Sequence, residues 1–191
     1  SASGFNTAKS TLITKNSGYD ADKLIEGLSL PLFIKPTDSG SSFGISKVYN
    51  SESISKAVSD AFAEGDAVIA ESFLDGIEVT CAVFRNREKL IALPITQIST
   101  ENDFFDYDAK YNGKSTEETP APVSEALTRE IQETSKEIYE ALRLGSVARI
   151  DFIVADGTPF VIEVNTIPGF SQASIVPQML KCAGIDLLDF W

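Results

Sequence analysis

The apolar positions in the N-terminal part of the chain are spaced first as strands and then as a helix. Short apolar runs bounded by turn-forming residues predict strands at 10–14, 30–35 and 67–72, and a further strand is expected to begin near Ile45. Between Ser51 and Gly65, apolar residues recur three and four positions apart. We therefore predict a helix there, with Ser51 as its N-cap and Gly65 at its C-terminal end.

The C-terminal part follows the same two spacings. Apolar runs predict strands at 77–84, 90–95, 147–154 and 160–164. A helix is expected to begin after Ser124 and to end at Gly145, and its apolar face consists of Leu127, Ile131, Ile138 and Leu142. The polar, acidic stretch 99–122 is long for a loop, and loops of that length are usually functional or disordered. A loop at 165–172 leads into a last helix.

The last two predicted strands flank an Asp156-Gly157 turn, and the register of this hairpin determines which side chains meet. If the loop is 156–158, Asp151 lies opposite Glu163 and Arg149 lies opposite Asn165, so four polar residues share one face. The other face then holds an apolar set: Ala148, Ile150, Phe152, Phe160, Ile162 and Val164. A two-residue loop would instead place Asp151 opposite Ile162.

Opposed carboxylates on this hairpin point to a bound cation. Directly paired residues have Cβ atoms about 5 Å apart, and two like charges there are destabilising unless something cationic lies between them. Asn165 adds a neutral oxygen to the carboxylates of Asp151 and Glu163, and Mg²⁺ prefers such hard ligands. The alternative interpretation is a solvated polar face with a salt bridge from Arg149.

Three further patterns are compatible with a nucleotide. The loop Gly40-Ser41-Ser42-Phe43-Gly44 is suited to lay backbone N–H groups over phosphates, with Lys35 as a point charge, although a flexible hairpin loop has the same composition. Glu71 and Glu78 flank a turn and are either ribose and adenine ligands or surface charges. The aromatic segment 104–111 is either a lid or a small satellite core. The two commonest phosphate-binding signatures are absent from the sequence.

The composition of the chain excludes several partners and reaction types. Lysine and arginine number 16 against 28 aspartates and glutamates, so the net charge of −12 repels nucleic acid. The chain contains no histidine, which excludes catalytic triads built on histidine. Cys81 and Cys182 lie in apolar surroundings without paired spacing, so we expect free core thiols in a reducing, cytoplasmic compartment. No apolar run is long enough to cross a bilayer, so a membrane is not an expected partner.

Taken in order, these segments resemble the ATP-grasp ligases, and within them the D-alanine:D-alanine ligase family. The resemblance covers nearly the whole chain. It rests on Phe33-Ile34-Lys35-Pro36 with the 40–44 loop, Glu71 to Glu78, Asp106-Tyr107-Asp108-Ala109-Lys110-Tyr111, Arg149-Ile150-Asp151-Phe152 and Glu163-Val164-Asn165-Thr166-Ile167-Pro168-Gly169-Phe170.

The resemblance implies an α+β protein with the ATP-grasp fold, in which two α/β subdomains with largely antiparallel sheets enclose the nucleotide. Residues 1–72 would form the central subdomain with the phosphate loop. Residues 73–191 would form the C-terminal subdomain with the metal and second-substrate sites. ATP is the implied nucleotide, bound with two Mg²⁺ ions for which Mn²⁺ can substitute.

The resemblance also assigns roles to individual residues. The nucleotide would be contacted by Lys35, Ser42, Glu71, the backbone of Phe73 and Leu74, Glu78, Phe104, Lys110 and Ile162. In this arrangement Lys35 and Lys110 bind phosphates, and Phe104 and Ile162 sandwich the base. The metal ligands would be Asp151, Glu163 and Asn165.

The implied reaction joins two D-alanine molecules. The carboxylate of the first takes the γ-phosphoryl group of ATP, and the amine of the second attacks the acylphosphate to give D-alanyl-D-alanine for peptidoglycan synthesis. Arg149 and the Gly169 N–H would stabilise the oxyanion, and Ser174 would hold the carboxylate of the second substrate. Ser41 and Tyr111 complete the implied catalytic set, and Tyr111 favours an amine nucleophile over a hydroxy acid.

Members of this family carry an additional N-terminal domain, so we expect this chain to be a fragment with little ligase activity by itself and the complete enzyme to be a possible homodimer. Two other interpretations stay open. One is an ATP-grasp carboxylate-amine ligase with a different amino acid substrate. The other is a non-catalytic nucleotide-binding module.

Overall fold

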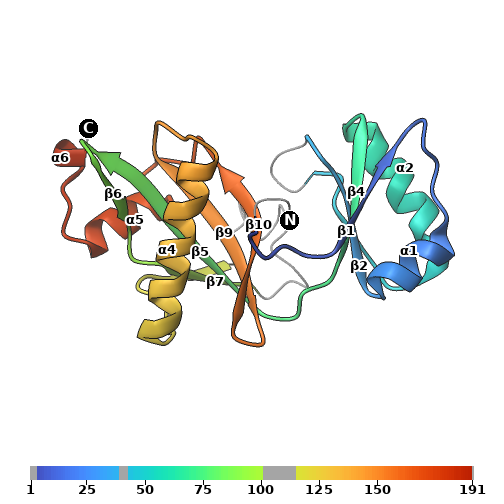
Figure 1. The fold of residues 1–191 in the computed structure, drawn as a ribbon, viewed down its shortest axis with the longest axis horizontal. Coiled ribbons are helices and arrows are strands. Elements are labelled where there is room, and N and C mark those ends of the chain that lie inside the picture. Colours follow the sequence, from blue (N-terminus) through green and yellow to red (C-terminus); the bar gives the residue numbers. More distant parts are fainter. Residues whose placement is uncertain (1–3, 39–42, 101–114, 191) are drawn as a thin grey trace. The chain divides into compact units, whose positions relative to one another are not determined.

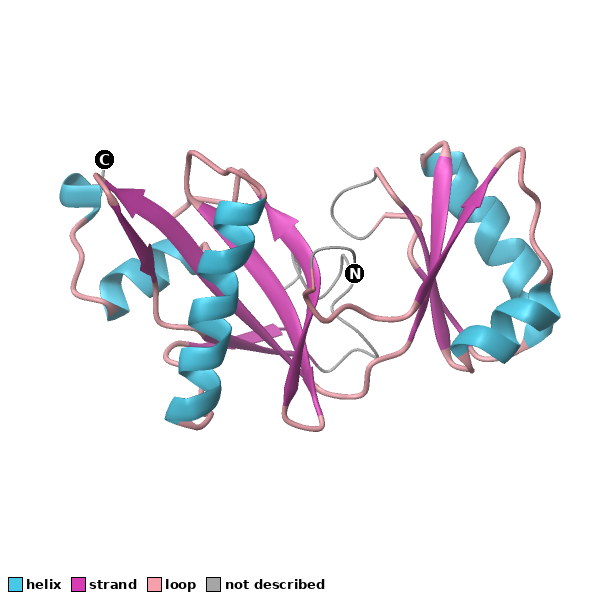
Figure 2. Cartoon of the chain, in the orientation of Figure 1, coloured by secondary structure: helices cyan, strands magenta, loops and turns pink. Residues whose placement is uncertain are grey.

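The computed structural model describes residues 4–38, 43–100 and 115–190. They form two compact units. The small unit comprises 8–38 and 43–74, and the large unit comprises 4–7, 75–100 and 115–190. Each unit has its own sheet, its own helices (Figure 2) and its own buried apolar cluster, so each is described by itself.

The small unit is a four-stranded antiparallel sheet covered by two helices. In spatial order its strands are β1 (Ser10–Thr14), β4 (Ala67–Ser72), β2 (Leu32–Pro36) and β3 (Ser46–Val48). Helices α1 (Ala21–Leu28) and α2 (Ile54–Glu64) pack against the sheet (Figure 1). Alternate residues of β2 are buried, because side chains of a strand point to opposite faces and only one face meets the helices.

The N-terminal caps of these helices differ from the prediction, whereas Gly65 is the C-cap of α2 as predicted. The helix expected after Ser51 begins at Ile54, after a short 3₁₀ turn η1 (Ser51–Ser53). Asn50 caps that turn, since its Oδ1 accepts a hydrogen bond from the Ser53 N–H at 3.0 Å, so the prediction of Ser51 as the cap was wrong. Helix α1 was not predicted. It is short, and Asp20 caps it by accepting hydrogen bonds from the backbone of Asp22 and Lys23.

The large unit contains a six-stranded sheet in which every described pair of named strands is antiparallel. Its strands are β5 (Ile77–Asn86), β6 (Lys89–Ala92), β7 (Thr96–Thr100), β8 (Ser115–Glu118), β9 (Ala148–Ala155) and β10 (Thr158–Asn165). The strand expected at 90–95 ends at Ala92, and β7 begins only at Thr96, because Pro94 between them has no N–H to continue a ladder.

Helix α4 (Glu125–Ala141) covers one face of this sheet along β5 and β6 (Figure 1). Its predicted cap is confirmed, since the Ser124 hydroxyl accepts a hydrogen bond from the Leu127 N–H at 3.2 Å. Ile131 and Ile138 are buried as predicted. Leu142, which was expected on the same face, is 53% exposed because the helix has ended before it.

The C-terminal residues form helices α5 (Ile175–Cys182) and α6 (Leu187–Phe190). The Phe190 ring lies 4.8 Å from that of Phe84 and 5.5 Å from that of Phe170. Phe84 alternates along β5 with the residues that face α4, so this aromatic group lies on the opposite face of the sheet. No helix in the described part of the chain is long and apolar enough to span a bilayer.

The two cysteines have different environments. Both are free thiols, but only Cys81 is buried, and Cys182 at the end of α5 is exposed, so the expectation of two core thiols was wrong for Cys182. Burial raises the pKa of Cys81 to about 12, and hydrogen bonds with Ser135 and the Leu93 backbone, together with the charge of Lys136, oppose this only in part.

We expect iodoacetamide at pH 8 to alkylate Cys182 rapidly in the folded protein and to leave Cys81 unmodified, because the thiolate is the reactive form and Cys81 stays protonated and covered. Peptide mass spectrometry measures both sites. The denatured chain is the control, in which both cysteines should react. Equal labelling of the two in the folded chain would contradict the assigned burial.

Candidate active site on the large sheet

The hairpin of β9 and β10 has a two-residue turn. Asp156 and Gly157 both have positive φ, 50° and 77°, which is the backbone of a type I′ turn and suits an Asp-Gly pair. Thr158 consequently pairs with Ala155. The predicted three-residue loop was therefore wrong, because the conformational preference of Asp-Gly favours the tighter turn.

A β-bulge restores the predicted pairing further along the hairpin. The register that begins at the turn continues to Val161 opposite Phe152, and then shifts by one residue at Ile162. Beyond the shift, Glu163 pairs with Asp151 and Asn165 pairs with Arg149. A bulge inserts one extra residue into one strand and commonly lies near functional sites. The polar residues share a face because of this extra residue, and not because of the loop length.

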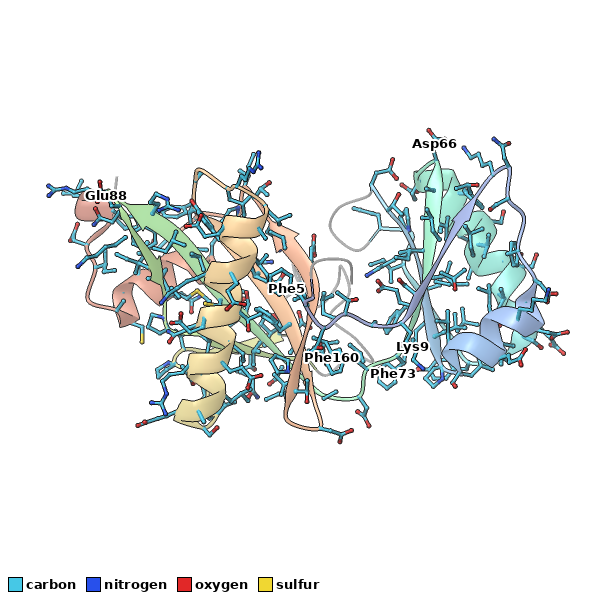
Figure 3. The ribbon with its side chains drawn as sticks, viewed as in Figure 1. Phe5, Lys9, Asp66, Phe73, Glu88 and Phe160 are labelled. Atoms are coloured by element: carbon cyan, nitrogen blue, oxygen red, sulfur yellow. The ribbon has the colours of Figure 1, made fainter. Side chains whose placement is uncertain are left out.

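The bulge also changes which residues of β10 face the core. Val161 and Val164 pack against the buried cluster that contains Phe152. Phe160 pairs with Ile153 and lies on the face of the sheet away from α4 (Figure 3). The prediction that Phe160 belongs to the core face was therefore wrong, because the tighter turn reverses its parity, while Ile162 lies at the bulge, outside the paired register.

Asp151 is the centre of a polar group that we call the Asp151 cluster, to which Glu163 belongs by its pairing with Asp151: Thr80, Arg149, Asp151, Glu163 and Asn165. Asp151 Oδ1 accepts hydrogen bonds from Thr80 Oγ1 at 2.6 Å and Arg149 Nε at 2.8 Å. Asp151 Oδ2 accepts from Arg149 Nη2 at 2.8 Å and Asn165 Nδ2 at 2.9 Å. These described donors use the roughly four lone-pair positions of a carboxylate.

Burial and charge make this cluster unusual among the described residues. Asp151 is only 6% exposed, and its ion pair with Arg149 is shielded from water, so the alternative of a solvated polar face does not describe these two residues. Burial is the largest single influence on the pKa of Arg149 and lowers it. The hydrogen bond to Asp151 and the nearby carboxylates together outweigh burial and raise the pKa; these carboxylates are Asp151, Glu163 and Glu78.

The donor set of the cluster fits a divalent cation in chemistry. Asp151, Glu163 and Asn165 supply hard oxygen ligands on one face, and Glu163 is exposed. The Nδ2–H group of Asn165 donates a hydrogen bond to Asp151, which leaves the amide oxygen of Asn165 for another partner. Within residues 4–38, 43–100 and 115–190 no group of three or more His, Cys, Asp or Glu side chains is placed to hold a metal.

The loop after β10 brings Gly169 close to Ser174. A Cβ on Gly169 would lie 3.1 Å from the Ser174 hydroxyl oxygen. Ser174 precedes α5, whose third residue is Pro177 and has no N–H to be capped. Its hydroxyl instead accepts a hydrogen bond from the Ser171 N–H at 3.0 Å and lies 2.9 Å from the Ser171 hydroxyl.

In the small unit, two residues expected at a nucleotide contact each other. Lys35 and Glu71 form an ion pair at 2.5 Å with both side chains largely covered. Phe73 follows β4, and the Lys47 ammonium lies 4.1 Å from the centre of its ring, a distance typical of a cation–π contact. Leu74 is the last of the described residues in this unit.

Of the remaining predicted site residues, one lies in the described part of the chain and five lie outside it. Glu78 lies on β5, opposite Ile153 of β9, and its charge reaches Arg149. Ser41, Ser42, Phe104, Lys110 and Tyr111 lie outside the described residues.

Sequence reasoning missed Thr80 and Ser171. Thr80 interrupts the apolar run of β5, and its parity with Glu78 would have placed it on the polar face. Its contact with Asp151 still depends on the pairing of β5 with β9, which are distant in the sequence. Ser171 had no signal of its own, since it is one of several serines around the loop.

Comparisons with known proteins identify relatives over nearly the whole chain. A family model described as the D-ala D-ala ligase C-terminus matches residues 1–190. The D-alanine–D-alanine ligase of Flavobacterium johnsoniae is 44% identical over 188 residues, and that of Bacteroides fragilis is 41% identical over 189 residues. Each match covers 98% of this chain and 58% of the relative, so the chain spans little more than half the length of these curated relatives.

Solved structures of similar proteins have the same fold. The D-alanine–D-alanine ligase of Bacillus anthracis complexed with ATP has a TM-score of 0.82 and 30% identity, and the match covers 99% of this chain and 59% of that one. The VanG D-Ala:D-Ser ligase of Enterococcus faecalis has a TM-score of 0.83 and 36% identity, with 96% and 54% covered. The α+β organisation with antiparallel sheets is therefore shared with these proteins.

Proposed function

The chain belongs to the D-alanine–D-alanine ligase family, through the C-terminal region of these proteins, and from this premise we propose that it carries the ATP- and magnesium-dependent part of a ligase that joins two D-alanine molecules. ATP is converted to ADP and phosphate, and D-alanyl-D-alanine supplies peptidoglycan synthesis in the cytoplasm. The proposed fold is ATP-grasp, and its expected subdomains, 1–72 and 73–191, differ from the two compact units at residues 4–7 and 73–74.

One observation carries this proposal. Asp151 pairs with Glu163 across the hairpin, and Arg149 lies beside them with Asn165 on the same face. The residues that the family resemblance names as metal ligands and as oxyanion donor thus meet in one cluster, from two strands that are joined by the Asp156-Gly157 turn and aligned by a bulge in β10. Glu163, Asp151 and Asn165 would hold Mg²⁺, which when bound neutralises phosphate charge and polarises the transferring group.

The nucleotide-binding role falls on residues of both units. In the small unit, the ammonium of Lys35 would bind phosphate oxygens, and Glu71 would accept a hydrogen bond from the base. The two side chains now pair with each other, so each is already oriented and partly desolvated. Backbone groups of Phe73 and Leu74, with Glu78 in the large unit, would contact the base and ribose. Ser42, Phe104, Lys110 and Ile162 complete the proposed set.

Acyl transfer would use groups at the end of β10. Arg149 keeps its charge in a partly buried position, so its guanidinium can stabilise the oxyanion that develops when the amine attacks the activated carboxyl group. The Gly169 N–H would donate to the same oxygen. Ser174, held by Ser171, would donate its hydroxyl proton to the carboxylate of the second substrate. Ser41 and Tyr111 are proposed as further catalytic residues.

A second candidate is a ligase that takes D-serine as the second substrate. The similarity to the VanG D-Ala:D-Ser ligase favours it specifically, since that structure is matched as well as the D-alanine–D-alanine ligases are. The two candidates share the proposed activation of D-alanine and differ only in the acceptor amine.

The complete enzyme, at the length of its relatives, is expected to form D-alanyl-D-alanine from D-alanine, ATP and Mg²⁺ with release of phosphate. D-Serine as the acceptor should be used less efficiently by about 10- to 100-fold in kcat/KM, the discrimination that one hydroxyl group typically allows in an apolar pocket. Chromatography of the dipeptides formed in competition measures the ratio. Preference for D-serine as the acceptor would select the second candidate. Failure to activate D-alanine with either acceptor would overturn both candidates.

The 191-residue chain by itself is expected to bind ATP with Mg²⁺ and to show little turnover, because it spans only 58% of its relatives. The complete enzyme is proposed as a homodimer. Calorimetry of Mg²⁺-dependent ATP binding to the chain, together with a phosphate-release assay, tests both parts of the activity proposal.

A further inference from the structure

Thr80 is a buried hydroxyl on the strand next to the proposed metal ligands. Thr80 is 0% exposed, and its Oγ1 lies 2.6 Å from Asp151 Oδ1 and 3.2 Å from the Ile150 carbonyl oxygen. A hydroxyl has one proton to donate. The closer, charged oxygen of Asp151 is the stronger acceptor, so the hydrogen bond goes to Asp151.

Thr80 is held more firmly than the other donors to Asp151. It pairs with Asp151 of β9 on one side and with Thr96 of β7 on the other, so β5 is fixed from both sides. Threonine is also stiff at χ1 because its side chain branches at Cβ. Strand β9 is likewise paired on both sides, with β5 and β10, but the side chains of Arg149 and Asn165 are only half-buried.

The chemistry of the donor matters as much as its rigidity. A hydroxyl orients the carboxylate without cancelling its charge, whereas a lysine or arginine at this position would compete with a bound cation. Oδ1 is held by Thr80 and by Arg149 Nε, while Oδ2 is bonded by Arg149 Nη2 and Asn165. Because the rigid Thr80 hydroxyl bonds only Oδ1, Oδ2 is the oxygen whose hydrogen-bond partners can be exchanged.

We propose that Thr80 is a positioning residue for the metal site: its hydroxyl holds Asp151 Oδ1 and leaves Oδ2 as the oxygen that exchanges a guanidinium hydrogen bond for the cation. This inference rests on the proposed function, in which Asp151 is a metal ligand. It adds a residue from β5 to a site that otherwise comes from the hairpin of β9 and β10.

The test compares two affinities of the 191-residue chain, for a non-hydrolysable ATP analogue complexed with Mn²⁺ and for the same analogue without metal. Thr80→Val removes the hydroxyl and keeps the shape. It is expected to raise the Kd of the Mn²⁺ complex by about 10- to 100-fold, the usual effect of losing a residue that orients a ligand. The Kd of the metal-free analogue should not change, although a general structural defect would raise both.

Two further variants guard against loss of folding and against a nonspecific effect. Thr80→Ser and Thr80→Ala both lack the methyl group and differ in the hydroxyl alone, so only the serine variant should retain the affinity for the Mn²⁺ complex. Thr96→Val is the matched control. Thr96 is also 0% exposed, pairs with Thr80 across the sheet, and has its hydroxyl 2.6 Å from that of Thr119, so its loss should leave both affinities unchanged.

Asp151→Asn separates failure of this inference from failure of the proposed function. If Asp151→Asn leaves the affinity for the Mn²⁺ complex unchanged, Asp151 is not a metal ligand and the proposed metal site is overturned. If Asp151→Asn weakens that affinity while Thr80→Val and Thr80→Ala do not, only the role of Thr80 is overturned. Equal weakening by Thr80→Ser and Thr80→Ala would also overturn it.

Discussion

Replacing Glu163 with glutamine is expected to lower the kcat of the complete enzyme by at least about 100-fold with Mg²⁺ present, and to leave its unfolding temperature unchanged. Glu163 is exposed, so the amide fits without a cavity or an unpaired buried group. The substitution removes one of the two carboxylates opposed on the hairpin. A bound metal supplies several kcal/mol of charge stabilisation, and each factor of ten in rate corresponds to about 1.4 kcal/mol.

A matched substitution isolates the charge of Glu163 from its surface position. Glu118 is also an exposed glutamate, but it lies on β8, opposite Gln97, away from the hairpin. Glu118→Gln should retain full activity. Steady-state phosphate release at several Mg²⁺ concentrations measures both variants, and near-normal turnover by Glu163→Gln would refute the metal role of this residue.

Replacing Asp151 with alanine is expected to cost about 3–5 kcal/mol of unfolding free energy in the large unit, in addition to abolishing metal binding. Removal of one partner of a buried ion pair leaves the other charge uncompensated. Here the Arg149 side chain is only 19% exposed, and Thr80 would lose its charged acceptor as well. Asp151→Ala should therefore be much more destabilising than Glu163→Gln.

Hydrogen exchange followed by mass spectrometry is suited to this measurement, because it reports the opening of β9 separately from the small unit. The double variant Arg149→Met/Asp151→Ala is the control. It removes both charges and should recover part of the lost stability, since an apolar replacement of a whole ion pair is often neutral. Equal protection of β9 in Asp151→Ala and in the parent chain would show that the pair does not stabilise this sheet.

The elements that were predictable are those whose signal is local. Strands β1 and β4 have the predicted bounds, and α4 begins after the predicted cap Ser124, because apolar periodicity and a capping hydroxyl act within a few residues. Helix α1 was not predicted, although Leu24, Ile25 and Leu28 recur at helical spacing, because its eight residues make only about two turns.

The register of the β9–β10 hairpin could not be predicted from local sequence preferences. Asp156-Gly157 favours a two-residue turn, and that choice alone would have placed Asp151 opposite Ile162. The bulge at Ile162 reverses the consequence and pairs Asp151 with Glu163. A bulge has no local sequence signal as strong as a turn, because it depends on which faces of the two strands must be buried against the rest of the sheet.

The sequence by itself determined most of the strands and the helices α2 and α4, the residues available to bind a cation, and the family to which these motifs belong. Only the tertiary structure decided which oxygen of Asp151 is held and by which neighbour. The pairing of β5 with β9 brings Thr80 against a carboxylate 71 positions away in the sequence. Periodicity records which side chains share a face of one strand. Contacts between strands depend on register, bulges and burial summed over the whole sheet, so they exist only in the folded unit.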